Sequence, residues 1–206
     1  MARRRRISAQ VKWWKRKSQS VSVATWNVRS LMESEGPLST ASASSHVVED
    51  RNIVRVVECL RRYDVDVAGL QETHWFGEAT YRIGGRLVLT SGRPLPAAGE
   101  SCRRGEGVAL VFGSRAEEAW RAGGCVVKSV SSRLMYARLK FVLRSGGVQW
   151  LRVICAYAPT FRSLRSVKDS FFADLQAALH GVCHDEEYVI MGDFNARVGS
   201  RLDYSE

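Results

Sequence analysis

The spacing of hydrophobic positions predicts a chain that combines strands and helices. Residues 21–26 alternate between apolar and polar side chains and are rich in β-branched residues, which is typical of a strand. Short apolar runs at 65–70 and 188–191 predict two further, buried strands. Apolar residues recur at helical spacing over 47–62 and 164–179, so both segments are expected to be amphipathic helices.

The middle of the chain is dominated by strand-like patterns. Two short strands are expected within 80–90, and four longer ones at 107–112, 125–130, 134–143 and 148–156. A Ser-Gly-Gly turn at 145–147 joins the last two as a hairpin, whereas 33–45 and 91–105 have the composition of loops. The order of these elements predicts a layered α/β domain with mixed sheets.

Length and composition narrow the class of protein. The 206 residues suffice for one domain of ordinary size or at most two small ones. The 45% of hydrophobic and 25% of charged residues exclude wholesale disorder, and no run approaches about 18 apolar residues, so no membrane span is expected. Five scattered cysteines without a Cys-x-x-Cys pair argue against a disulfide framework or a structural zinc site and favour a reducing compartment.

The net charge of +10 is concentrated at the N-terminus. Residues 1–20 contain eight basic residues and no acidic one, while the other 186 residues carry 23 basic and 21 acidic side chains. We therefore expect a basic, disordered tail over 1–20 and a nearly neutral domain over 21–206. Such tails serve phosphate contact, nuclear import or mitochondrial import, or are inert. Trp13 and Trp14 could stack on nucleic-acid bases or pack on the domain.

Polar residues follow four of the expected strands, where the strand ends of a layered α/β protein converge. They are Asn27, Glu72, Tyr157 and the pair Asp193 with Asn195. If the chain stays extended, the side chains of Asp193 and Asn195 point to the same side. Carboxylate and amide oxygens suit a hard cation such as Mg²⁺. Taken singly, each of these residues is more commonly a turn residue, a helix cap or a solvated loop charge.

The sequence contexts of these residues resemble those of one family. The four motifs are Thr25-Trp26-Asn27-Val28, Leu70-Gln71-Glu72-Thr73-His74, Tyr157-Ala158-Pro159-Thr160 and Gly192-Asp193-Phe194-Asn195-Ala196. In this order and at these spacings they are similar to the endonuclease/exonuclease/phosphatase superfamily. The nearest resemblance is to the apurinic-endonuclease-like domain of LINE-type retrotransposons and related host proteins, over about residues 21–200.

The resemblance implies a fold and an activity. The fold would be a two-sheet, four-layer α/β sandwich of the DNase-like kind, and the activity would be Mg²⁺-dependent hydrolysis of phosphodiesters, generally nicking of DNA. Mn²⁺ is an alternative to Mg²⁺. The forms of the Glu72 and Asp193 motifs favour nucleic acid over inositol-phosphate or sphingolipid substrates. Nuclear localisation is expected, with the cytoplasm and mitochondria as alternatives.

The resemblance also implies roles for single residues. Glu72, together with Asp193, would ligate the metal, and Asn27 would position the network around it. Asp193 would orient or deprotonate the attacking water. Asn195 would donate to the scissile phosphate, and Tyr157 would donate to the transition state or shape its site. His74 and Trp75 follow the metal-binding glutamate and would face substrate, or else pack against the domain.

The chain departs from the family pattern in two places. Arg29 stands where many relatives have an acidic residue. The Ser-Asp-His type motif that ends the family pattern is not found after Gly-Asp-Phe-Asn, and His46, His74, His180 and His184 do not take its place. We therefore expect a truncated domain whose second half is incomplete, with an exposed strand edge and weak or no nuclease activity.

Three hypotheses follow. The leading one is an endonuclease-type phosphodiesterase that binds DNA through its active-site cleft and its basic tail. The alternatives are a catalytically dead nucleic-acid-binding remnant of a retrotransposon endonuclease and a protein-interaction module. Preference for abasic sites, for a target sequence or for no particular site stays open, as do a following reverse transcriptase and the oligomeric state.

Overall fold

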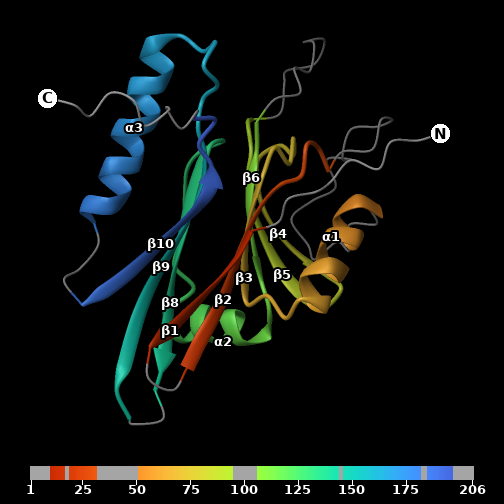
Figure 1. The fold of residues 1–206 in the computed structure, drawn as a ribbon, viewed down its shortest axis with the longest axis vertical. Helices are drawn as coiled ribbons and strands as arrows, with labels where there is room; N and C mark the ends of the chain where they lie inside the picture. Colours follow the sequence, from red (N-terminus) through yellow and green to blue (C-terminus); the bar gives the residue numbers. More distant parts are fainter. Residues whose placement is uncertain are drawn as a thin grey trace, which may run out of the picture.

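A computed structural model describes residues 10–16, 19–31, 51–94, 106–143, 146–181 and 185–196. Two sheets lie face to face within these residues (Figure 1). The first has the strand order β1-β2-β3-β6-β5-β4, and the second has the order β10-β9-β8-β7. The strands of the first sheet are β1 (Gln10–Arg16), β2 (Gln19–Asn27), β3 (Val67–Gln71), β4 (Glu78–Ile83), β5 (Arg86–Ser91) and β6 (Val108–Phe112). Those of the second are β7 (Val127–Ser131), β8 (Leu134–Val142), β9 (Val148–Tyr157) and β10 (Glu186–Asp193).

Helices cover the outer faces of the two sheets (Figure 1). Helix α1 (Arg51–Arg62) packs on the first sheet through an apolar cluster that includes Ile53 and Leu60. Helix α3 (Arg165–His180) packs on the second sheet through Phe171 and Leu175. The expected four-layer α/β sandwich is thereby confirmed. Whether its second half is incomplete stays a prediction.

The central core fills the space between the sheets. β3, β5 and β6 are buried along their whole length, because one of their faces meets a helix or loop layer and the other meets the second sheet. Helix α2 (Ser114–Ala122) packs against this core and contributes Trp120 to it. Within the described residues, no helix is both long enough and apolar enough to span a bilayer.

The structure differs from the sequence-based expectation at two elements. Residues 10–16, expected to belong to a disordered tail, form β1, which pairs antiparallel with β2 from Gln10↔Thr25 to Arg16↔Gln19. Helix α2 was not expected, and it follows β6 after a single residue. Residues 1–9, the expected loop at 33–45, most of the loop at 91–105 and Ser145 of the expected turn lie outside the described residues.

Candidate active site at the strand ends

Two parallel strand pairs deliver the polar residues to one end of the sandwich. In the first sheet β2 runs parallel to β3, with Asn27 opposite Gln71, and Glu72 follows directly. In the second sheet β9 runs parallel to β10, with Tyr157 opposite Asp193. Parallel strands end at the same edge of a sheet, so each pair brings two of these residues together.

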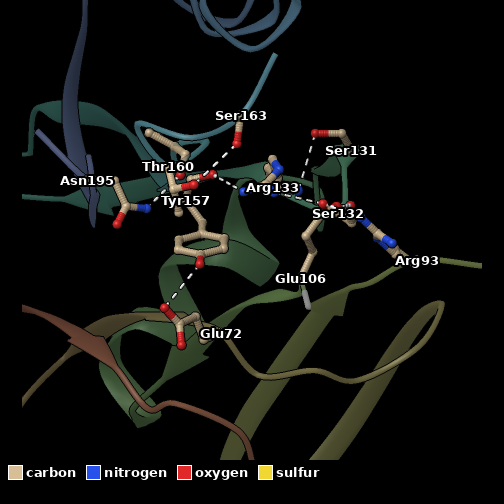
Figure 2. A network of polar contacts seen from close by, with 11 residues as sticks. Glu72, Arg93, Glu106, Ser131, Ser132, Arg133, Tyr157, Thr160, Ser163 and Asn195 are labelled. Carbon is tan, nitrogen blue, oxygen red and sulfur yellow. Dashed lines mark hydrogen bonds and ion pairs between the residues drawn. The ribbon is translucent and has the colours of Figure 1, made fainter. Parts of the chain in front are cut away.

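Hydrogen bonds join these residues across the two sheets. The Asn27 Nδ2 atom donates to Glu72 Oε1 at 2.7 Å and to Asp193 Oδ2 at 2.8 Å. The Tyr157 hydroxyl donates to the same Glu72 oxygen at 3.0 Å (Figure 2). Asn27, Glu72, Tyr157 and Asp193 therefore form one network, although they come from four different segments of the chain.

Asn195 joins this network through the backbone. Its N–H donates to Asp193 Oδ1 at 2.9 Å, and its Nδ2 donates to the Ala158 carbonyl oxygen at 2.7 Å. The φ angle of Asn195 is 47°, so the chain turns after β10 instead of staying extended. The condition for the expected same-side orientation, an extended chain, is therefore not met at Asn195, and the two residues are joined by the hydrogen bond from the Asn195 N–H to Asp193.

Left-handed backbone conformations concentrate in the same segments. Five of the seven described non-glycine residues with positive φ lie here: Arg29, Ser30, Glu72, His74 and Asn195. Such conformations are uncommon and persist where surrounding contacts enforce them. The Ser30 N–H donates to the Glu72 carbonyl at 2.7 Å, and the Thr73 N–H donates to the Gly107 carbonyl at 3.1 Å. The loops around Glu72 are thus held by main-chain hydrogen bonds.

The two residues expected to face substrate have different environments. Trp75 is only 2% exposed, belongs to the core beneath α1 and makes an edge contact with Tyr81 at 5.9 Å between ring centroids. The expectation that Trp75 faces substrate is therefore wrong, because its ring is enclosed by the core. His74 is half-buried beside Glu72 in the sequence, and its role in substrate binding stays a prediction.

The environment of Tyr157 keeps its hydroxyl protonated. Burial raises the pKa of Tyr157 from its ordinary 10.0 to about 12, and the charge of Glu72 and the hydrogen bond to it act in the same direction. The Arg133 guanidinium lies over the ring, 5.0 Å from its centroid, and its charge opposes this rise. At neutral pH Tyr157 is therefore a hydrogen-bond donor and not a base.

The residues present fit a hard divalent cation. Glu72 Oε1 and Asp193 Oδ2 both accept a hydrogen bond from the Asn27 Nδ2 atom, at 2.7 and 2.8 Å, so the two carboxylate oxygens lie close together. Within the described ranges, neither carboxylate is part of an ion pair. No group of three or more His, Cys, Asp and Glu side chains is placed to hold a metal in the described part of the chain, so the protein's contribution here would be these two carboxylates. Two carboxylates are an ordinary protein contribution to Mg²⁺, which keeps waters or substrate phosphates as its other ligands.

Two further polar residues lie beside the site, and the sequence did not point to them. Arg133, just before β8, and Glu106, just before β6, form an ion pair of 2.7 Å next to Tyr157 (Figure 2). Both are charged residues in connecting segments, where such residues are usually solvated. Only the packing of the two sheets brings them together, so no spacing in the sequence could have identified them.

Comparison with known proteins identifies the family. A model described as the Endonuclease/Exonuclease/phosphatase family matches residues 24–204. Craniofacial development protein 2 of Bos taurus is 28% identical over 179 residues, which is 87% of this chain and 25% of that protein. Craniofacial development protein 2 of Tragulus javanicus matches to the same extent, so the chain spans about a quarter of the length of these curated relatives.

Two solved structures are similar over most of the chain. The catalytic domain of Xenopus laevis APE2 has 17% identity and a TM-score of 0.49, covering 84% of this chain and 58% of that one. D. rerio TDP2, complexed with a single-strand DNA product, has 15% identity and a TM-score of 0.44, covering 86% and 62%. The match of the family model to residues 24–204 confirms the resemblance expected from the sequence. The chain therefore belongs to the endonuclease/exonuclease/phosphatase family.

Proposed function

We propose that the chain is a divalent-metal-dependent phosphodiester hydrolase of endonuclease type, with DNA as substrate and Mg²⁺ as the metal. The observation that carries this proposal is the pair of carboxylates, Glu72 and Asp193, held side by side by the single amide of Asn27. Two neighbouring carboxylates repel each other, and a bound cation would offset this repulsion. Enzymes of this family generally depend on a divalent metal.

The chain's own residues supply the remaining parts of a hydrolytic site. Asp193 is fixed by hydrogen bonds to both of its oxygens, which suits it to orient a water and accept a proton from it. The Asn195 amide nitrogen donates one hydrogen to the Ala158 carbonyl, and the Asn195 side chain also interacts with the Tyr157 hydroxyl, so a phosphoryl oxygen would take the second hydrogen in place of that contact. The protonated Tyr157 hydroxyl has a single hydrogen, which it donates to Glu72, so it would stabilise the charge that develops in the transition state only by exchanging that hydrogen bond for one to the substrate.

Glu72 and Asp193 are the residues that would hold the metal. When bound, a divalent cation supplies Lewis acidity at a phosphoryl oxygen. Asn27 donates to both carboxylates and has no negative charge of its own, so its part is to orient these ligands.

The charge distribution supports nucleic acid as the substrate. Eight basic residues and no acidic one lie within residues 1–20, against a nearly neutral remainder. Part of this segment is β1, whose sequence includes Lys12, Lys15 and Arg16. Because β1 pairs with β2, the basic segment is joined to the sheet that carries Asn27. A cationic segment on the sheet that carries part of the site favours a polyphosphate backbone over a small neutral substrate.

Nicking of supercoiled plasmid tests the proposal. The chain should relax the plasmid in Mg²⁺ or Mn²⁺ at a low rate, in keeping with the weak activity expected from the sequence, and an excess of EDTA should abolish this activity. Glu72→Gln and Asp193→Asn preserve side-chain size but remove the charge, and each should lower the rate by at least about 100-fold. Asp169→Asn is the matched control, because Asp169 is an exposed carboxylate on α3 and should leave the rate unchanged.

Two outcomes contradict the proposal. One is the absence of nicking in either metal when the protein is in excess over the plasmid. The other is an equal rate in the Glu72, Asp193 and Asp169 variants, which would reveal a contaminating nuclease. Retention of DNA without any nicking would favour the nucleic-acid-binding alternative.

The contribution of the basic segment needs a variant that leaves β1 in place. Deletion of residues 1–20 would remove β1, so replacement of Arg3, Arg4, Arg5 and Arg6 by Gln is preferable. If these residues contact phosphates, the variant should bind DNA more weakly and with a smaller dependence on salt concentration. Unchanged binding and salt dependence would show that the arginines make no such contact.

A further inference from the structure

We propose that the ion pair between Glu106 and Arg133 is a clamp between the two sheets that positions Tyr157 against Glu72. Both are positioning residues. The inference rests on the proposed function, because Tyr157 matters only if the site acts on a phosphodiester. Its first test does not depend on activity.

The clamp connects the two sheets at the end where the site lies. Glu106 immediately precedes the β6 region of the first sheet, and Arg133 lies in the turn between β7 and β8 of the second. The Arg133 Nη2 atom donates to Glu106 Oε1 at 2.7 Å, and the Ser132 hydroxyl donates to Glu106 Oε2 at 2.5 Å. Arg93, which follows β5 of the first sheet, forms an ion pair with the same carboxylate (Figure 2).

The ion pair is largely shielded from water. The Glu106 and Arg133 side chains are 12% and 17% exposed. Burial disfavours the charged form of Glu106, but hydrogen bonds from Arg93 and Ser132 and the charges of Arg133 and Arg93 outweigh it and lower the pKa to about 2. Glu106 is therefore ionised at neutral pH, and the pair is stronger than an exposed one would be.

Arg133 contacts Tyr157 in three ways. Its guanidinium covers the ring, 5.0 Å from the centroid, and its Nη1 atom donates to the Tyr157 carbonyl at 3.3 Å. The Tyr157 N–H donates to the Arg133 carbonyl at 2.8 Å. Both the backbone and the ring of Tyr157 are thus fixed by Arg133, whose own side chain is fixed by Glu106.

The hydrogen bond between Tyr157 and Glu72, which the clamp is proposed to position, joins the two sheets. Tyr157 ends β9 in the second sheet, whereas Glu72 follows β3 in the first, and their hydrogen bond is 3.0 Å long. Its length therefore depends on how closely the sheets approach at this end. Ser91, at the end of β5, donates to the Ser131 carbonyl of β7 at 2.8 Å and is a second link of the same kind. Loosening the clamp should move the Tyr157 hydroxyl away from Glu72.

Glu106→Gln is the informative variant, and the protein offers a matched control. Gln has the size of Glu but no charge, so the variant weakens the clamp without leaving a cavity. Glu117 also binds two arginines, Arg82 and Arg121, and its side chain is 11% exposed. Glu117→Gln therefore removes a similar charge from a similar setting on α2, away from Tyr157.

Fluorine NMR of protein labelled with 3-fluorotyrosine gives a direct readout. Tyr157→Phe identifies the Tyr157 resonance by its loss. We expect this resonance to shift or broaden in Glu106→Gln and to stay in place in Glu117→Gln. An unmoved resonance in Glu106→Gln, or an equal change in both variants, would overturn the proposal. If Glu106→Gln does not fold, Arg133→Lys takes its place in the same experiment. Lys keeps the positive charge but has no planar group over the Tyr157 ring, so the Tyr157 resonance should again shift or broaden, and an unmoved resonance would overturn the proposal.

Plasmid nicking provides the second readout. Misplacement of a catalytic group by about 1 Å can reduce a rate about 100-fold, so kcat in Glu106→Gln should fall about 10- to 100-fold with KM nearly unchanged. The double variant with Tyr157→Phe should be no slower than Tyr157→Phe alone. Additive effects of the two substitutions would contradict positioning through Tyr157. Inactivity of the unsubstituted chain would contradict the proposed function but not the clamp, because the NMR comparison tests the clamp without any activity.

Discussion

Asn27 illustrates how one neutral side chain can hold two negative ones. Its amide nitrogen has two hydrogens, and these are directed to Glu72 and Asp193 at 2.7 and 2.8 Å. Its amide oxygen accepts the Arg29 N–H at 3.1 Å, which fixes the orientation of the group. An aspartate at this position would add a third negative charge, and a serine would be too short to reach both carboxylates. The residue type is therefore explained by its hydrogen bonds.

Replacement of Asn27 by Ala should destabilise the protein. Two neighbouring carboxylates would lose their shared donor, and the expected loss in the free energy of unfolding is about 1–3 kcal/mol. Urea denaturation followed by circular dichroism measures this loss. Added Mg²⁺ should recover part of the stability, because a cation replaces the missing donor. A midpoint equal to that of the unsubstituted protein, with and without Mg²⁺, would contradict this account.

The cysteines should differ sharply in reactivity. Burial raises the pKa of the Cys155 thiol to about 12, and its Sγ atom lies between the sheets, 3.4 Å from the Leu70 carbonyl. Cys125, by contrast, is exposed. Mass spectrometry after alkylation at pH 8 should therefore find Cys125 modified and Cys155 unmodified in the native protein. Labelling of both in urea is the control, and rapid native labelling of Cys155 would contradict its burial.

At the scale of elements, hydrophobic periodicity predicted the strands and helices that bury a continuous face. β2, β3, β9 and β10 were predicted because apolar runs of strand length end in polar residues, and α1 and α3 because apolar residues recur at helical spacing. Helix α2 was missed because it is short and two of its four buried residues are small alanines. β1 was missed because a basic sequence shows no buried side, and its pairing with β2 depends on main-chain hydrogen bonds.

The candidate site was predictable to the extent that its residues end strands. Asn27, Glu72, Tyr157 and Asp193 all follow from that position and from the family motifs, and the structure brings them together. For Trp75 the sequence left two expectations open, substrate contact and packing, because its place in a loop motif does not indicate which side the core covers, and the structure shows packing.

Gly192 is required by the close approach of β10 to β9. A Cβ atom at Gly192 would lie 2.3 Å from the Ala156 carbonyl oxygen, which is a backbone atom and cannot move aside without shifting the strand. Gly192→Ala should therefore lower the free energy of unfolding by about 1–3 kcal/mol, measured in urea. Gly181→Ala is the control, since its nearest neighbour is the end of the Arg152 side chain, at 3.3 Å, and not a backbone atom at 2.3 Å. Equal losses in both variants would contradict the steric explanation.

At the scale of the whole molecule, polar contacts add to the apolar core in holding the two sheets together. Near the site, Glu106 and Ser91 of the first sheet contact Arg133, Ser132 and Ser131 of the second. The core between the sheets does not depend on pH, whereas the contacts of Glu106 do. Protonation of Glu106 in acid should therefore weaken the contacts between the sheets at the end that carries the site.

The direction of this pH dependence follows from the pKa of Glu106. Its folded-state pKa of about 2 lies below its ordinary value of 4.5, so its stabilising contribution is complete above pH 4.5 and is lost as the pH falls towards 2. Urea denaturation between pH 7 and pH 2.5 should show this loss in the unsubstituted protein. The loss should be smaller in Glu106→Gln, which is less stable at pH 7. Parallel curves for the two proteins would contradict a contribution from Glu106.

The position of β1 has a consequence for how the chain can be shortened. Removal of residues 1–16 would strip β1 from the sheet and leave the outer edge of β2, which ends in Asn27, without its partner. A shortened variant should therefore keep Gln10–Arg16 if the strand that carries Asn27 is to stay supported. The same reasoning advises placing affinity tags at the other end of the chain.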